Sequence, residues 1–359
     1  MNLPAIPKGA RVYLRPEGFV DTPVGNDGQV ERLAGAMLWY SAWELIVDNG
    51  GRVGRALVPV SDRASLPDEA APILERLAAA RPPIRMRERV IRLDQPQVAG
   101  ILNMTPDSFS DGGRNADLET AVGAGFAMAE AGAALIDVGG ESTRPGAAHV
   151  WEGDEIKRVA PVIERLAAGG VAVSIDTRKA AVMEAALAAG AAMVNDISAL
   201  RYDHRALEVV ARSGCPVILM HHTGREPHDG PKLTDPLIEV YDWLEDRIAA
   251  VEAAGIARDR IIVDPGIGFA KGVADNLALL NGLALFHGLG CPVMLAASRK
   301  RIIGALDNEA PAERRLGGSI TLALHGAQRG MQFLRVHDAP ETVQALRVWR
   351  GLRDQALIA

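Results

Sequence analysis

The sequence predicts an α/β protein: a (β/α)8 barrel, or TIM barrel, preceded by a small N-terminal α/β extension. From about residue 98 onward, short apolar runs alternate with longer alanine-rich stretches. The runs are apolar almost throughout, as are strands of a parallel sheet that is buried on both faces. Eight such units close a barrel, and in a barrel the active site lies at the carboxyl ends of the strands.

The eight runs are expected to be strands at 98–103, 134–139, 171–176, 192–196, 216–221, 261–264, 292–297 and 332–337. Each run has a polar residue at or near its end, and in a barrel these residues meet at one mouth: Asn103, Asp137, Asp176, Asn195, His221, Asp264, Lys300 and Arg335. An open, doubly wound sheet is the alternative architecture. No Gly-x-Gly-x-x-Gly follows the first run, which argues against the dinucleotide-binding version of that sheet.

Helices are predicted between the runs, where apolar residues recur three or four positions apart among good helix formers. The ranges are 121–131, 154–168, 179–189, 235–254 and 313–328. We expect residues 87–359 to form the barrel, and residues 1–86 to form an N-terminal α/β extension of unknown role.

The extension carries its own structural signals. Strands are predicted at 11–15 and 53–60, and helices at 30–47, which contains Trp39 and Trp43, and at 68–80. The alternating segment 85–93 is expected to be a hairpin that closes the floor of the barrel. No phosphate-binding Gly-x-x-x-x-Gly-Lys loop is present in the extension.

Composition excludes several classes of protein. The 359 residues are 48% hydrophobic and 23% charged, which is ordinary for a globular protein and excludes global disorder. A net charge of −6 argues against general nucleic-acid binding, and no apolar run is long enough to span a membrane. The two cysteines, Cys215 and Cys291, cannot form a disulfide framework. With no secretory signal at the N-terminus, we expect a cytoplasmic protein.

Two loops that follow predicted strands suit an anion and its counterion. Asn103 ends the first strand and offers an uncharged oxygen, which suits Mg²⁺ because this cation takes few protein ligands. Arg144 lies in the Gly-rich loop after the second strand and could bind a phosphate or a carboxylate with its two-pronged side chain. The alternative roles are a turn cap for Asn103 and a solvated surface side chain for Arg144.

Three further strand ends suit a flat heterocycle. Asp176, Asn195 and Asp264 place carboxylates and an amide where burial requires partners. A ring with an amidine-like donor edge would satisfy them, and mutual pairing with Lys300 or Arg335 is the alternative. Positive charge from Lys300, Arg335 and His337 reaches the same mouth, and together with Mg²⁺ it makes pyrophosphate a suitable guest.

The motifs that contain these residues together resemble the dihydropteroate synthases, a family of (β/α)8 transferases of folate synthesis. The resemblance covers about three quarters of the chain, from residue 87 onward, and rests on five motifs in the family's order. These are Gly100-Ile-Leu-Asn-Met-Thr-Pro-Asp-Ser-Phe-Ser-Asp-Gly-Gly113, Gly139-Gly-Glu-Ser-Thr-Arg-Pro-Gly-Ala147, Asp264-Pro-Gly-Ile-Gly-Phe-Ala-Lys271, Ser298-Arg-Lys300 and Arg335-Val-His-Asp338.

The resemblance implies a reaction and a set of roles. 6-Hydroxymethyl-7,8-dihydropterin diphosphate and p-aminobenzoate would give 7,8-dihydropteroate and pyrophosphate. The family's pterin contacts fall on Asp176, Asn195, Asp264 and Lys300, and its pyrophosphate contacts on Asn103, Arg144, Arg335 and His337, with Mg²⁺ bound at Asn103. The p-aminobenzoate pocket falls on Phe109, Thr143, Pro145, Phe269, Lys300 and Arg301. Asp176, Lys300, Asn103 and Arg335 would be the catalytic residues.

The resemblance further implies a homodimer that is a sulfonamide target, and loops 103–113 and 139–147 that close over the site. Two positions depart from the family's pattern. Arg301 stands where many members have Ser, and Thr223 replaces a longer amide in Met220-His-His-Thr-Gly224. Both departures bear on p-aminobenzoate and sulfonamide binding.

Two alternatives of a different class stay open on the sequence. One is the pterin- or methyltetrahydrofolate-binding barrel of a corrinoid methyltransferase system, which would need the pterin contacts but no pyrophosphate site. Arg144, Arg335 and His337 favour the synthase over this module. The other is a non-catalytic barrel that uses its N-terminal extension for assembly, and the complete set of motifs argues against it.

Overall fold

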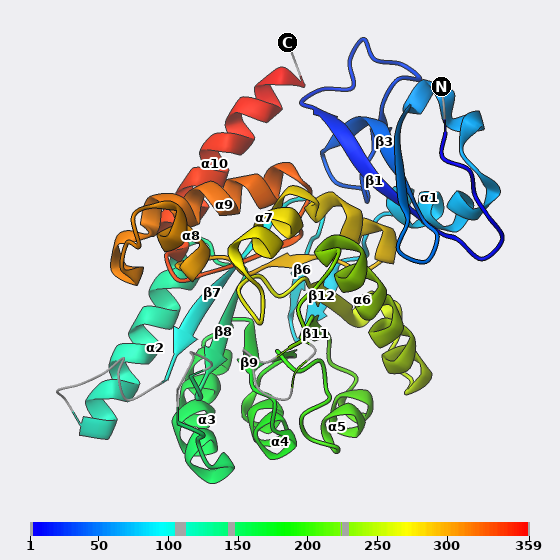
Figure 1. Ribbon diagram of the computed structural model, residues 1–359. Helices are drawn as coiled ribbons and strands as arrows, with labels where there is room; N and C mark the ends of the chain where they lie inside the picture. The colour runs from blue at the N-terminus through cyan, green and yellow to red at the C-terminus, as the bar shows by residue number, and fades with distance from the viewer. Residues whose placement is uncertain (1–2, 105–112, 143–147, 223, 225–229, 358–359) are drawn as a thin grey trace.

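The computed structural model confirms the predicted barrel (Figure 1). It describes residues 3–104, 113–142, 148–222, 224 and 230–357. Eight parallel strands follow one another in the order β12-β11-β10-β9-β8-β7-β14-β13, and a parallel bridge between Val263 and Val293 brings the two ends together. The strands are β7 (Gln97–Asn103), β8 (Leu135–Gly139), β9 (Val173–Asp176), β10 (Met193–Asp196), β11 (Val217–Met220), β12 (Ile261–Asp264), β13 (Met294–Leu295) and β14 (Phe333–Val336).

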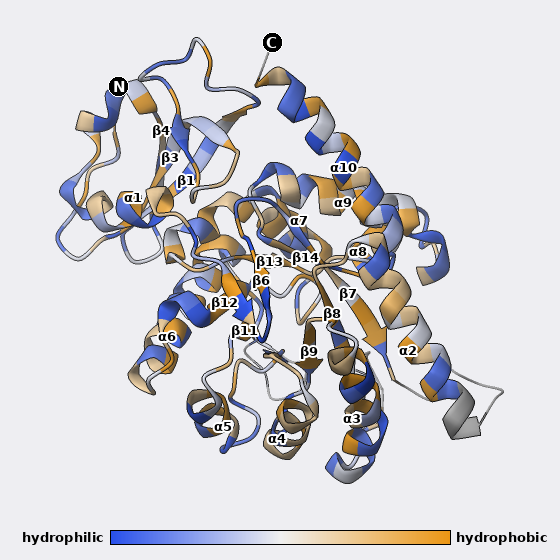
Figure 2. Ribbon diagram, turned by 180° about the vertical axis from the view of Figure 1, so that it is seen from behind, coloured by the Kyte–Doolittle hydropathy of each residue, from blue (hydrophilic) through white to orange (hydrophobic). Residues whose placement is uncertain are grey.

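Helices surround this sheet and supply the outer layer of the core. The five predicted helices correspond to α2 (Gly113–Ala131), α3 (Glu152–Ala168), α4 (Ala180–Ala189), α6 (Pro236–Ala253) and α9 (Leu316–Gln328). The others are α5 (Ala206–Ser213), α7 (Val273–Asn281), α8 (Arg301–Leu306) and α10 (Ala339–Ala356). Figure 2 shows the hydrophobic strands inside and mixed polar and apolar residues along the helices. None of the helices in the described residues is both long and apolar enough to cross a membrane.

The predicted hairpin closes the floor of the barrel. Strands β5 (Ile84–Met86) and β6 (Arg89–Ile91) pair antiparallel. Their buried side chains form one cluster with the first residues of the barrel strands. Met86 is only 1% exposed and packs in the same cluster as Phe333 of β14. The predicted boundary at 86/87 falls on the turn of this hairpin. Both strands pack with the barrel, so β5 belongs to the barrel and not to the N-terminal extension.

The N-terminal residues form a small antiparallel sheet. Strands β1 (Arg11–Val20) and β4 (Val53–Pro59) flank β3 (Trp39–Asp48), and the short β2 (Glu31–Arg32) also pairs with β3. Helix α1 (Ala71–Ala78) packs on this sheet and confirms the helix predicted at 68–80. We call residues 3–80 the N-terminal lobe.

The helix predicted at 30–47 is wrong. Residues 39–48 form the central strand β3, which pairs with β1 along nine positions and with β4 along seven. Aromatic and β-branched residues such as Trp43 and Ile46 favour a strand, because their side chains pack well on a pleated surface. The spacing of leucines and alanines in this segment is compatible with a helix when the segment is considered alone. Pairing with the two flanking strands makes it a strand. Trp43 is fully buried, and its indole nitrogen donates to the Tyr40 hydroxyl at 3.1 Å.

The lobe packs against helix α6 and the 283–289 segment of the barrel. The ring of Tyr13 lies edge-on to Tyr241, with centroids 5.3 Å apart, and its hydroxyl donates to Asp242 at 2.9 Å. Arg11 pairs with Glu245 at 2.5 Å, and Arg76 pairs with the same carboxylate at 3.2 Å. Tyr13 is 1% exposed and belongs to the core of the barrel, so the lobe is an integral part of the packed structure.

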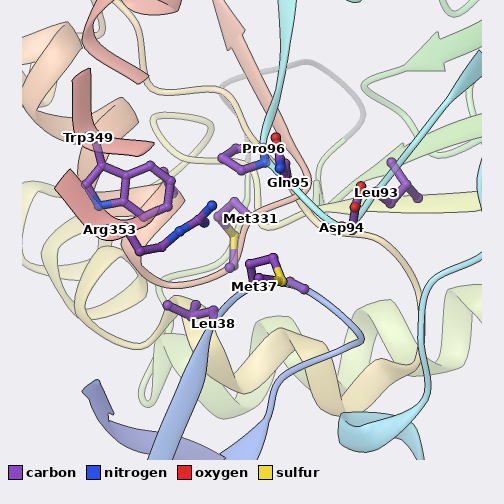
Figure 3. A pocket seen from close by; sticks show the side chains of 12 residues that line it. Met37, Leu38, Leu93, Asp94, Gln95, Pro96, Met331, Trp349 and Arg353 are labelled. Carbon is purple, nitrogen blue, oxygen red and sulfur yellow. The ribbon is translucent and has the colours of Figure 1, made fainter. Parts of the chain in front are cut away.

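The seam between lobe and barrel also contains a small cavity (Figure 3). Met37 and Leu38 line it from the lobe, Met331 from the barrel, and Trp349 and Arg353 from helix α10. Its volume of about 10 Å³ is barely enough to admit one water molecule. The cavity is therefore a packing defect and too small for a substrate.

Candidate active site

The polar strand-end residues meet at one mouth of the barrel, as the spacing predicts. Asn103, Asp176 and Asp264 are the last residues of β7, β9 and β12. Asn195 and Arg335 each precede the last residue of their strand. Because all eight strands are parallel, these side chains belong to the same carboxyl-terminal face.

Arg335 lies at this face between the carboxylates of Asp137 and Asp176. Its Nε donates to Asp137 Oδ2 at 2.5 Å, and its Nη2 donates to Asp176 Oδ2 at 2.5 Å. Asp137 is 1% exposed and also accepts from Asn195 Nδ2 at 2.9 Å and from the Ser174 hydroxyl at 2.5 Å. The alternative weighed on the sequence, mutual pairing of carboxylates with Arg335, is therefore present.

Asp176 has an unusual ionisation. Burial raises its pKa to about 7, the charge of Arg335 opposes this rise, and the nearby charge of Asp137 adds to it. Burial also opposes the charge of Arg335, but the two carboxylates outweigh it and raise the pKa of the guanidinium. A carboxyl group whose pKa is displaced within a cleft is a candidate functional group.

Asn103 lies beside Asp176, with Gly139 between them. A Cβ atom added to Gly139 would lie 3.4 Å from Asp176 Cβ and 3.8 Å from Asn103 Oδ1. Gly139, at the end of β8, thus lies between the ends of β7 and β9, at ordinary van der Waals distance from both side chains. The amide oxygen of Asn103 is brought near the carboxylate that faces Arg335.

Lys300 and Phe269 form a second group at the mouth. The ammonium of Lys300 lies 4.4 Å from the centre of the Phe269 ring and donates to the backbone oxygen of Ile267. Burial lowers the pKa of Lys300 to about 8, although Asp264 opposes the shift. Gly268 has a φ of +83°, and a Cβ there would come within 3.1 Å of Lys300 Cδ. This loop therefore shapes the position of the lysine.

Asp264 and Lys271 hold the turn that presents Phe269. Asp264 Oδ1 accepts from the backbone N–H of Gly266 at 2.7 Å, and burial raises the pKa of this carboxyl. Lys271 Nζ donates to the backbone oxygens of Gly266 at 2.9 Å and Phe269 at 3.1 Å. Burial lowers the pKa of Lys271 to about 7. No role was predicted for Lys271 from the sequence, and its two bonds to backbone oxygens show that it stabilises the turn.

His337, Arg301 and His221 lie at different parts of the mouth. His337 follows β14, and its Nδ1 lies 3.1 Å from the Ser298 hydroxyl. Arg301 is the first residue of α8 and is exposed. His221 follows β11 and is buried against the ring of Trp243, with centroids 4.9 Å apart. Burial lowers the pKa of His221 to about 2, so this imidazole is neutral.

Several residues expected at the site lie outside the described residues. They are Phe109, Thr143, Arg144, Pro145 and Thr223. The roles expected for them remain predictions.

The sequence identified Asp137 as a strand-end residue but assigned it no role. In the structure it is the anchor of Arg335 and Asn195. Asp196 was also passed over. Its carboxylate accepts from the backbone of Ser198 at 2.7 Å and of Leu200 at 2.9 Å, which holds a turn where Leu200 has a φ of 62°. The signal available in the sequence was an ionisable residue inside an otherwise apolar strand, because such a residue needs a buried partner.

The described residues fit Mg²⁺ as a cation shared with a substrate. They contain no cluster of three or more His, Cys, Asp or Glu side chains placed to hold a metal ion. Asn103 offers a single neutral oxygen at the mouth. A site of this kind suits a cation that retains water and takes its other ligands from substrate phosphates, and it does not suit a structural zinc ion.

Comparisons with known proteins agree with this geometry. The family model described as "Pterin binding enzyme" matches residues 99–337. Dihydropteroate synthase of Escherichia coli strain K12 is 46% identical over 259 residues, which span 71% of this chain and 91% of that protein.

Solved structures extend the similarity. Xanthomonas albilineans dihydropteroate synthase with 4-aminobenzoic acid superposes with a TM-score of 0.72 at 48% identity, over 76% of this chain and 99% of that one. The same enzyme in complex with 7,8-dihydropteroate gives a TM-score of 0.69 at 46% identity, over the same shares of the two chains. This chain therefore belongs to the dihydropteroate synthase family of pterin-binding enzymes.

Proposed function

We propose that this protein is a transferase that joins 6-hydroxymethyl-7,8-dihydropterin diphosphate to p-aminobenzoate and forms 7,8-dihydropteroate and pyrophosphate. The observation that carries the proposal is the Asp137–Arg335–Asp176 arrangement beside Lys300. It combines acceptors for the donor edge of a pterin with positive charge for a leaving anion.

The pterin is assigned to Asp176, Asn195, Asp264 and Lys300. The carboxylates and the amide oxygen accept hydrogen bonds from the ring's amine and N–H groups, and the lysine donates to an acceptor of the ring. Asp264 supports this role because its carboxylate is buried at a strand end, where each hydrogen bond that it accepts offsets part of its desolvation. Asn195 is held by Asp137, so its side chain is already oriented before a ligand arrives.

The diphosphate is assigned to Asn103, Arg144, Arg335 and His337. Asn103 would hold Mg²⁺, and the cation would supply neutralisation of part of the charge of the leaving group. Arg335 contributes a guanidinium that is held in place by its two carboxylates. Such an oriented cation stabilises developing negative charge without a reorganisation cost during the reaction.

p-Aminobenzoate is assigned to Phe109, Thr143, Pro145, Phe269, Lys300 and Arg301. The Phe269 ring and the stem of Lys300 provide an apolar surface for its ring. Arg301 is exposed at the start of α8 and provides a partner for the carboxylate. A sulfonamide would compete for the same surface, so inhibition should be competitive with p-aminobenzoate.

The chemistry requires no covalent intermediate on the protein. The bond between the pterin methylene and the diphosphate oxygen breaks as the bond to the amine nitrogen forms, and the nitrogen then passes one proton to the released pyrophosphate. Asp176 stabilises the positive charge that develops on the pterin methylene, and Arg335 stabilises the departing pyrophosphate. A site that excludes water protects the electrophile, since water would otherwise give the hydroxymethyl pterin.

Steady-state assays of the purified full chain with both substrates and Mg²⁺ test this proposal. The expected result is equal release of dihydropteroate and pyrophosphate, with Asp176→Ala and Lys300→Ala each below detection. Lys157→Ala is the matched control, because Lys157 pairs only with the exposed Asp154 on α3 among the described ion pairs. Absence of product from the unmodified chain would overturn the proposal, and near-normal turnover by either site variant would overturn that residue's role.

The same measurements separate the synthase from a methyltetrahydrofolate-binding barrel. A module of that kind binds its pterin equally well with or without a diphosphate. The Arg335 arrangement favours the synthase, which should bind the diphosphate ester much more tightly than the free hydroxymethyl pterin.

We also propose a cytoplasmic homodimer. Helix α10 exposes Val348 at 61% and Leu352 at 71%, and α9 exposes Leu316 at 39%, which are apolar side chains that a second copy would cover. Free, buried Cys215 and Cys291 suit a reducing compartment. Sedimentation of the purified chain should give twice the monomer mass, and Leu352→Glu should give a monomer. A monomeric unmodified chain would contradict the dimer.

A further inference from the structure

The loop that carries Lys300 is joined to the end of β14 by two pairs of residues. The backbone N–H of His337 donates to the Ser298 hydroxyl at 3.2 Å. One position further along both segments, Arg299 Nε donates to Asp338 Oδ2 at 3.0 Å, and Arg299 Nη2 donates to the other carboxylate oxygen. The proposed chemistry gives no role to Arg299 or Asp338, and we call these two residues the clamp.

The two pairs continue the register of the strands that lie before them. Both pairs of partners between β13 and β14 are 39 positions apart in the chain, and the same 39 positions separate Ser298 from His337 and Arg299 from Asp338. Strand β13 has only two residues, so its backbone pairing with β14 ends early. Side chains therefore hold the two segments side by side beyond the point where the strands stop pairing.

The backbone of Arg299 is held in an uncommon conformation. Its φ of 56° lies in the left-handed region, which is costly for a residue with a side chain and persists only where the surroundings impose it. The backbone N–H of Arg299 donates to the Ser319 hydroxyl at 2.9 Å, and its backbone oxygen accepts from Arg315 Nη1 at 2.8 Å. Both partners lie at the start of α9. Lys300, the next residue, thus extends from a point that is fixed from two sides.

Asp338 directs its carboxylate to the clamp and away from the helix that it precedes. An aspartate before a helix commonly accepts from a backbone N–H of the first turn, but Asp338 makes no such bond to α10. Both of its oxygens accept from Arg299, and a two-pronged pair of this kind fixes orientation as well as distance. These bonds raise the pKa of Arg299, and Glu313 and Glu341 add to the rise. The guanidinium is therefore committed to acidic partners.

The ammonium of Lys300 is buried among groups from several strands. Asp264 of β12, Arg335 of β14 and Asp176 of β9 all act on its charge. It also donates to the backbone oxygen of Ile267. A shift of the Lys300 backbone would move the ammonium away from these partners and toward solvent. Its surroundings therefore depend on how firmly the clamp holds the residue before it.

We propose that the clamp fixes the ammonium of Lys300 relative to Arg335, and that Arg299 and Asp338 are positioning residues for the reaction at this mouth. This inference rests on the proposed function. The two residues act through the backbone, because Arg299 directly precedes Lys300 and Asp338 lies three positions after Arg335.

The direct test is the titration of Lys300 in the full chain. Nuclear magnetic resonance of carbon-13-labelled lysine side chains measures it, and the signal that disappears in Lys300→Arg identifies the residue. The pKa of about 8 in the unmodified chain should rise toward the ordinary lysine value of about 10.4 in both Arg299→Met and Asp338→Asn, because the ammonium gains solvent. The two substitutions change the net charge in opposite directions. A direct effect of charge would therefore shift the two pKa values in opposite directions.

Steady-state assays measure the consequence for the reaction. In both variants kcat/KM for dihydropteroate formation should fall by roughly 10- to 100-fold, because small misplacements of a reacting group have effects of this size. Arg165→Met is the matched control. It removes another two-pronged pair, in which Arg165 near the end of α3 donates to both oxygens of Glu119 at 2.9 and 3.2 Å. This variant should match the unmodified chain in both measurements.

Three outcomes overturn the inference: an unchanged kcat/KM, a loss of kcat/KM without a shift in the Lys300 titration, or shifts of opposite sign in the two variants. If Arg299→Met does not fold, as judged by thermal melting, Arg299→Lys applies the same criteria, since it keeps the charge and cannot form the two-pronged pair. An unmodified chain that makes no dihydropteroate refutes the proposed function itself. An active unmodified chain with normal clamp variants refutes only the role of the clamp.

Discussion

At the scale of single residues, Asp137 determines how Arg335 is presented. Arg335 reaches the mouth with two of its nitrogens already bound to carboxylates, and Asp137 also orients Asn195. The sequence predicted that these side chains meet, because parallel strands place their ends on one face. It could not predict which of them pair, since pairing depends on side-chain directions that the spacing does not contain.

Asp137→Asn should weaken both stability and function. One of the three donors that now face the carboxylate would meet an amide N–H, and loss of a buried ionic partner costs about 3–5 kcal/mol. Chemical denaturation and binding of the pterin diphosphate measure the two effects. Asp154→Asn, which disrupts an exposed pair on α3, serves as the control and should change neither. Stability of Asp137→Asn equal to that of the control would contradict this role.

Lys300 should set the alkaline limit of substrate binding. Its pKa is lowered to about 8, so the ammonium is charged below pH 8 and becomes neutral as the pH rises through that value. The affinity for the pterin diphosphate should therefore fall above pH 8. Titration calorimetry at pH values on both sides of 8 measures it. Lys300→Arg stays charged, so its affinity should fall much less above pH 8 than that of the unmodified chain. A parallel decline in the variant would assign the limit to another group.

At the scale of elements, the barrel strands and helices are predictable because each has a strong local pattern. The buried parallel strands are continuously apolar, and α3 and α6 bury one face each. The hairpin at 84–91 is also visible as an alternating segment. Strand β3 is the exception, because its identity depends on pairing with β1 and β4, which lie on either side of it in the chain.

The hairpin that closes the barrel floor should be a major source of stability. Met86 is 1% exposed within the floor cluster, so Met86→Ala leaves a cavity and should cost about 2–5 kcal/mol. Urea denaturation followed by circular dichroism measures this loss. Val90→Ala in the same hairpin is the control, since Val90 is 50% exposed and its truncation should have little effect. Equal effects of the two changes would show that the floor is not packed as described.

At the scale of the whole molecule, the N-terminal lobe and the barrel share one packed interior. Tyr13 belongs to the barrel core, and ion pairs from Arg11 and Arg76 fix the lobe to α6. The sequence separated the lobe from the barrel by composition and by the absence of site motifs. It could not show this seam, because the contacts join residues that are 169 to 234 positions apart in the chain.

Lobe and barrel should therefore unfold together. Tyr13→Ala removes an aromatic side chain from the seam and should cost about 3–5 kcal/mol. Differential scanning calorimetry should show one transition for the unmodified chain and a lower melting temperature for the variant. Leu57→Ala, on the exposed part of the same sheet, should melt like the unmodified chain. Two separate transitions in the unmodified chain would contradict the shared interior.

The central claim is that the carboxyl-terminal mouth of the barrel binds the pterin diphosphate beside Arg335. A crystal structure of the full chain with Mg²⁺, the pterin diphosphate and an unreactive analogue of p-aminobenzoate tests it most directly. The account predicts the pterin ring against Asp176, Asn195 and Asp264, and the diphosphate against Asn103 and Arg335. A pterin bound elsewhere, or a ring in this mouth with its diphosphate directed away from Arg335, would contradict it.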